Sequence, residues 1–71
     1  MEDYHKRVIA EKWDLDEKIE RLVNFMGSPK IHDVEPVERD RLRAQLGAMS
    51  EYSAILGMRI AAFSHPEATG G

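Results

Sequence analysis

Residues 42–63 read LRAQLGAMSEYSAILGMRIAAF, and this stretch decides the fold. Apolar side chains recur along it at alternating steps of four and three residues, the repeat of a helix that packs along one seam against another helix. Only Ser53 interrupts the repeat. Pro36 suits the first turn of a helix and His65-Pro66 ends the pattern, so the sequence predicts a helix over about 36–63. The seam positions are Leu42, Leu46, Met49, Ser53, Leu56, Ile60 and Phe63.

The N-terminal stretch carries a second seam with the same spacing, which predicts a helix over about 3–26. Lys12 occupies the one seam slot without an apolar residue, where its aliphatic stem could pack while its ammonium reaches water. Gly27 is expected to end this helix as a left-handed cap, because Pro29 cannot continue it. The apolar seam positions are Val8, Leu15, Ile19, Leu22 and Met26.

The two predicted helices make an all-α domain over residues 1–63. Residues 27–35 form a connector that joins the two helices into an antiparallel hairpin, and its Ile31 and Val34 are expected to cover the closed end. Residues 64–71 are polar and small, and we expect a disordered tail.

Each helix carries more apolar surface than one neighbour can cover. A chain of 71 residues is also near the lower limit for a stable core of its own. The sequence therefore predicts that the hairpins assemble into an oligomeric helical bundle, with the protein itself as partner. The candidate interface residues are Ile9, Trp13, Ala48, Ile55 and Ala62.

Composition removes several classes of function. The chain has 10 Lys and Arg against 13 Asp and Glu, a net charge of −3, so the basic surface of a duplex-DNA binder is missing. It has no cysteine, and its three histidines are not spaced as metal ligands, so we expect no metal and no cofactor. No catalytic motif is present, which argues against an enzyme. With no membrane span and a charged N-terminus, we expect a cytoplasmic protein.

One end of the hairpin gathers residues suited to an anionic ligand. Equal rise along two antiparallel helices would place Tyr4 level with Arg59 and Val8 level with Ile55, at the end away from the connector. Aromatic rings beside guanidinium groups can stack on a base and pair with a phosphate. The candidate ligand-binding residues are Tyr4, His5, Arg7, Tyr52 and Arg59.

Two alternatives stay open at this point. The basic side chains near the N-terminus could simply point outward and pair with neighbouring acids, and Trp13 and Tyr52 could be buried between subunits. In the stretch ERDRLR, Arg39, Arg41 and Arg43 alternate with acids, which is typical of a solvated helix face.

The two helical patterns resemble a family of very short phage-encoded proteins of unassigned function, including members from crAss-like phages. The resemblance covers about residues 4–63 and rests on RV-x2-EK-x2-LDEKI-x2-L-x2-F and ER-x-RL-x2-QL-x2-M-x2-YS-x-IL-x2-RI-x2-F. It implies a phage accessory protein and assigns no catalytic residue. Small phage proteins of this kind commonly act against host defence, and some helical hairpins among them form oligomers that sequester cyclic nucleotide signals.

Two hypotheses from different classes follow. The first is a non-enzymatic oligomer that captures a small anionic nucleotide signal such as a cyclic dinucleotide. The basic residues at the end of the hairpin away from the connector, here called the open end, favour it. The second is a protein–protein inhibitor or assembly module that binds a host defence protein through its acidic helical surface, for which the net negative charge argues.

Overall fold

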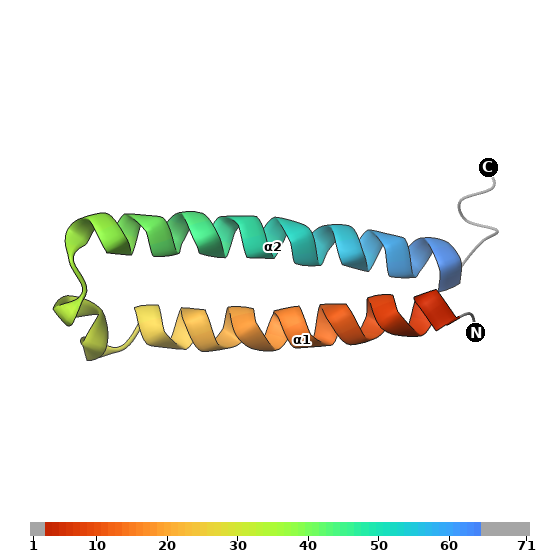
Figure 1. Cartoon of the computed structure of the whole chain (residues 1–71), viewed down its shortest axis with the longest axis horizontal. Coiled ribbons are helices and arrows are strands. Elements are labelled where there is room, and N and C mark those ends of the chain that lie inside the picture. The colour runs from red at the N-terminus through yellow and green to blue at the C-terminus, as the bar shows by residue number, and fades with distance from the viewer. Residues whose placement is uncertain (1–2, 65–71) are drawn as a thin grey trace.

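The computed structural model describes residues 3–64, which form two long helices joined by a short one. Helix α1 spans Asp3–Met26, the 3-10 helix η1 spans Pro29–Asp33, and α2 spans Pro36–Ser64. The long helices lie side by side and antiparallel, so α1 begins at the end where α2 finishes (Figure 1). The predicted all-helical hairpin is confirmed, with no strand in the described range; assembly into an oligomer stays a prediction. Residues 65–71 of the expected tail lie outside the described residues, and Ser64 belongs to α2.

Helix α1 is stabilised along its outer face by ion pairs one turn apart. Lys18 lies 3.9 Å from Asp14, and Arg21 donates a hydrogen bond of 3.0 Å to Glu17. In both pairs the acid precedes the base by four residues, the orientation that best supports a helix. Asp3 in the first turn places a negative charge at the positive end of the helix dipole.

The end of α1 differs from the expected glycine cap. No described glycine has a positive φ, so the prediction of a left-handed Gly27 is wrong. The Gly27 amide still donates to the carbonyl of Val23 at 3.0 Å. The Ser28 hydroxyl and amide both donate to the carbonyl of Phe25, at 2.7 and 3.1 Å. A serine therefore satisfies a carbonyl at the end of the helix, and the chain passes directly into η1.

The connector is more ordered than a plain loop. In η1 the Ile31 amide donates to the Ser28 carbonyl at 3.2 Å, and the Val34 amide donates to the Ile31 carbonyl at 3.1 Å. Ile31 and Val34 are half-buried, and η1 packs against α1. The closed end of the hairpin thus has its own small apolar cover.

Arg39 corrects the expectation of a uniformly solvated basic stretch. Arg41 and Arg43 are exposed and pair with acids three residues earlier, at 3.4 and 2.7 Å. Arg39 is half-buried and its Nε donates a 2.8 Å hydrogen bond to the Val34 carbonyl. Of the three arginines it is the one that contacts the connector, and its hydrogen bond links α2 to the residue that follows η1.

Replacing Arg39 with alanine is therefore expected to lower the free energy of unfolding by about 0.5–1.5 kcal/mol, because the Val34 carbonyl loses its charged donor. Urea unfolding followed by helical circular dichroism measures the change. Arg41→Ala is the matched control and should change stability by less than about 0.5 kcal/mol, because its pair with Glu38 is exposed. Equal effects from the two variants would contradict the role given to Arg39.

The core is a single line of side chains between the long helices. Val8, Leu15 and Leu56 are the buried apolar residues in residues 3–64, and Leu56 is fully buried. Four half-buried side chains extend this line along the hairpin. They are Ile19, Met49, Ile60 and Phe63.

Candidate functional site

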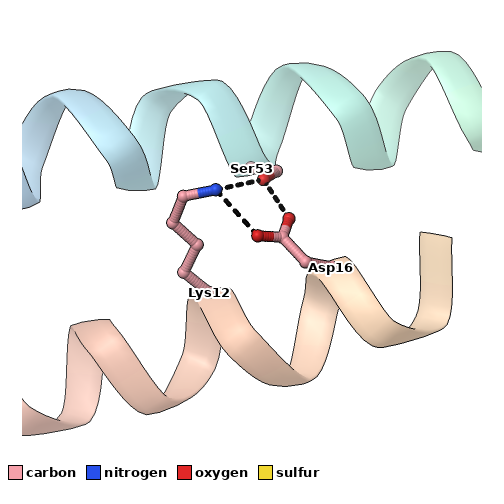
Figure 2. A network of polar contacts seen from close by, with 3 residues as sticks. All are labelled: Lys12, Asp16 and Ser53. Carbon is pink, nitrogen blue, oxygen red and sulfur yellow. Dashed lines mark hydrogen bonds and ion pairs between the residues drawn. The ribbon is translucent and has the colours of Figure 1, made fainter. Parts of the chain in front are cut away.

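A polar network interrupts the apolar seam near its middle. The Lys12 ammonium donates to Asp16 Oδ2 at 2.8 Å and to Ser53 Oγ at 2.9 Å, and the Ser53 hydroxyl donates to Asp16 Oδ1. Figure 2 shows Lys12 and Asp16 rising from α1 toward Ser53 on α2. The Lys12 side chain remains 27% exposed, and its ammonium is also held between the helices by two oxygen acceptors, which the sequence pattern did not predict.

This network is best explained as a device that sets the pairing of the helices. Ser53 is only 7% exposed, and its hydroxyl is already engaged as donor and acceptor, so it offers no free nucleophile. A polar residue at a seam position commonly fixes the register of two helices, since a shifted pairing would leave its partners buried and unsatisfied. The serine that breaks the seam in the sequence thus has its partners across the hairpin.

The same contacts act on the acidity of Asp16. Hydrogen bonds from Lys12 and then Ser53 hold the pKa of the Asp16 carboxyl below its ordinary value of 3.8. Partial removal from water raises the pKa, and the positive charge of Lys12 lowers it further.

A lowered pKa means that the folded protein holds the Asp16 proton less tightly than the unfolded chain. The stability from this carboxylate is present above the unfolded pKa of about 4 and is lost as the pH falls through the folded value. Urea midpoints measured from about pH 6 to about pH 2 should therefore fall more steeply for the native protein than for Asp16→Asn. Asp14→Asn is the control, because Asp14 is exposed and lies 3.9 Å from its lysine. Parallel pH curves for the native protein and Asp16→Asn would contradict the prediction.

Three aromatic rings pack together at the open end. The His5 and Phe63 rings are stacked, with centroids 3.9 Å apart and planes 4° apart. The Tyr4 ring meets His5 edge-on at 4.2 Å and Phe63 edge-on at 6.2 Å. Tyr4 remains 54% exposed, so one ring of the cluster is available at the surface. The structure thus brings together two of the predicted ligand residues, Tyr4 and His5. It adds Phe63, which was predicted only as a seam residue.

The ring of Tyr4 contacts a later residue of α2 than the one predicted to lie level with it. Equal rise placed Tyr4 level with Arg59, but its ring packs on Phe63, one helical turn further along α2. Side chains in a helix lean toward its N-terminus. In an antiparallel pair, this lean carries an α1 side chain toward later residues of α2 than its Cα position indicates. Sequence spacing alone does not include this displacement.

Three of the five cations that have no acidic partner in residues 3–64 lie at this same end, and the other two, Lys30 and Arg39, lie at the connector end. Five of the basic residues, Lys12, Lys18, Arg21, Arg41 and Arg43, form ion pairs with acids of their own helix. Lys6, Arg7 and Arg59 form none within the described range, and both arginines are exposed. Guanidinium groups left without a carboxylate are the ones available to an external phosphate.

Tyr52 lies apart from the aromatic cluster. Its ring is 43% exposed and makes none of the ring contacts found in residues 3–64. It precedes Arg59 by seven residues, which is about 10.5 Å along the helix. The structure therefore does not bring Tyr52 into contact with Tyr4.

The predicted interface residues are accessible in the single hairpin. Trp13 is 73% exposed, more than any other large apolar residue in the described range, and Ile55 is 42% exposed. Ala48 and Ala62 are also exposed, whereas Ile9 is half-buried. No contact with a second copy bears on these residues, so the interface stays a prediction.

Two kinds of feature are absent from residues 3–64. No group of three or more His, Asp and Glu side chains in that range could hold a metal ion. Neither of its long helices combines the length and apolar character needed to cross a bilayer.

A comparison with known protein families gives one match. The family model described as Sequestin matches residues 2–62, which include the connector, the polar network and every seam position except Phe63. The chain belongs to the Sequestin family. Neither the curated proteins nor the solved structures contain a significant match. The Sequestin name is consistent with a binding protein that sequesters its partner rather than transforms it.

Proposed function

We propose that this Sequestin is a phage accessory protein of the host cytoplasm that acts against host defence. It works as a non-enzymatic, oligomeric sponge for a small anionic nucleotide signal such as a cyclic dinucleotide. A sponge lowers the free concentration of a signal by binding it without changing it, which agrees with the family name.

The observation that carries this proposal is the chemistry of the open end. Arg7 and Arg59 are exposed and have no acidic partner in the described chain, and Tyr4 presents a half-exposed ring on the same end. A guanidinium can form two parallel hydrogen bonds to a phosphate, while an aromatic ring stacks on a base. His5 supports the Tyr4 ring through its stack on Phe63. Tyr52 completes the proposed set, reached by a ligand that extends along α2.

A second function is favoured by one different observation. The Trp13 side chain is 73% exposed on α1, and exposed tryptophans are frequent anchors of protein interfaces. Together with the net charge of −3, this supports a protein inhibitor that docks on a basic surface of a host defence protein. The two functions use different residues, so they can be separated by experiment.

Thermal unfolding of the purified protein with a panel of cyclic and linear nucleotides tests the proposal directly. A nucleotide at 100 times its dissociation constant stabilises the folded state by about 2.7 kcal/mol, a clear rise in melting temperature for a small protein. The bound nucleotide should be recovered chemically unchanged after denaturation, as a sponge requires. If no nucleotide shifts the transition, the protein-inhibitor function becomes the better explanation. If the nucleotide is recovered as a product, a non-enzymatic sponge is excluded.

A further inference from the structure

Helix α2 carries a second seam beside the one that packs on α1. We call it the outer seam. Each of its residues directly precedes a residue of the inner seam, so it repeats the same alternating steps of three and four along the helix. All six members are exposed in the hairpin. The outer seam consists of Gln45, Ala48, Tyr52, Ile55, Arg59 and Ala62.

The middle of the outer seam is the most apolar exposed surface of α2. Tyr52 and Ile55 are 43% and 42% exposed, and Met58 beside them is 64% exposed. Small alanines at positions 48 and 62 flank this centre and allow another helix to approach closely. A helix that is apolar on two sides needs two neighbours, and α1 supplies only one.

We infer that the outer seam packs against the outer seam of a second copy of this chain, with the two α2 helices antiparallel. The inference rests on the oligomeric part of the proposed function and names its interface. An interface of this kind is two-fold symmetric, so each contact occurs twice. At the centre of this interface, Tyr52 of each copy packs against Ile55 of the second copy.

Charge decides the direction of the two helices. Glu51 and Arg59 bracket the apolar centre, and neither forms an ion pair within residues 3–64. Parallel helices in register would place like charges beside each other. Antiparallel helices place Arg59 of one copy beside Glu51 of the second copy, and the reverse pair forms by symmetry. This complementarity points to a second copy as occupant, because the same helix supplies both charges.

The interface also bears on the ligand site. Arg59 then has a carboxylate of the second copy within reach, which a ligand phosphate would have to displace. Tyr52 is covered by the second copy, so the interface takes it out of the proposed ligand set. Tyr4, His5 and Arg7 lie on α1, outside the outer seam, and keep their accessibility. The inference therefore places the primary phosphate contact of the proposed site on Arg7.

Sedimentation velocity of the purified full chain at micromolar concentration, without nucleotide, tests the interface. The native protein should sediment as a multiple of 8.1 kDa, and Ile55→Asp should dissociate it. Val23→Asp is the matched control, since Val23 is 47% exposed on α1, outside both the outer seam and the predicted interface residues, and should leave the mass unchanged. A monomeric native protein, or dissociation by Val23→Asp but not by Ile55→Asp, would overturn the inference.

A charge reversal tests the direction and does not disturb the core. Arg59→Glu and Glu51→Arg should each raise the dissociation constant of the oligomer by about tenfold or more, because like charges then meet across the interface. The double variant should restore assembly to near the native value. If neither single reversal weakens assembly, or the double variant fails to restore it, the antiparallel interface is wrong. Since no nucleotide is present, these outcomes are independent of whether the sponge binds one.

Discussion

Leu56→Ala should lower the free energy of unfolding by about 2–5 kcal/mol, the usual cost of emptying a buried leucine position. Leu56 is the one fully buried side chain in residues 3–64, and it lies between the two long helices. A small hairpin has little stability to lose, so the variant should lose much of its helical signal at room temperature. Urea titration followed by circular dichroism gives the change, at one fixed protein concentration because assembly contributes to stability.

The control for Leu56 is Glu17→Ala on the outer face of α1. Glu17 accepts a hydrogen bond from Arg21 but is well exposed, so its loss should cost under about 0.5 kcal/mol. Comparable losses from the two variants would show that the core is not centred on Leu56.

The second large effect is expected for ligand binding. Arg7→Ala should weaken binding of the nucleotide found in the panel by about 10- to 150-fold, the equivalent of about 1.5–3 kcal/mol for a hydrogen bond to a charged phosphate. Arg7 lies near the N-terminus of α1, where the helix dipole disfavours a cation, so helix stability gives no reason for its presence. Calorimetry measures the affinity, and sedimentation verifies that the oligomer is intact.

Two variants sharpen the Arg7 experiment. Arg7→Lys should recover only part of the affinity, because an ammonium cannot make the paired contacts of a guanidinium. Arg41→Ala should have little effect, since Arg41 is paired with Glu38 near the connector. A loss of binding from Arg41→Ala with none from Arg7→Ala would move the site away from the open end.

Periodicity predicted the helical hairpin well because the seam of each helix is nearly unbroken. The polar residues at seam positions were also informative. Ser53 and Lys12 were the two polar interruptions, and the structure places both in one network. Asp16 could not be assigned to that network from spacing, because it lies just outside the α1 seam. Its link to Ser53 depends on the register between helices, which no local pattern encodes.

The candidate site was predictable in composition but not in arrangement. The basic and aromatic content of the open end follows from sequence position once a hairpin is assumed. The stack of His5 on Phe63 does not, because it depends on the lean of side chains along antiparallel helices. The Gly27 prediction failed for a local reason. A serine hydroxyl satisfied the free carbonyl of Phe25, so no left-handed residue was needed.

The antiparallel course of the two helices has a practical consequence for handling this protein. Helix α1 begins and α2 finishes at the same end of a molecule 49 Å long, beside Tyr4 and Arg7 (Figure 1). A fluorophore attached to α1 at Asp3 or to α2 at Ser64 would therefore lie at the end where the ligand is proposed to bind. A label on the exposed Lys30 of η1 would sit at the opposite end and leave that surface clear.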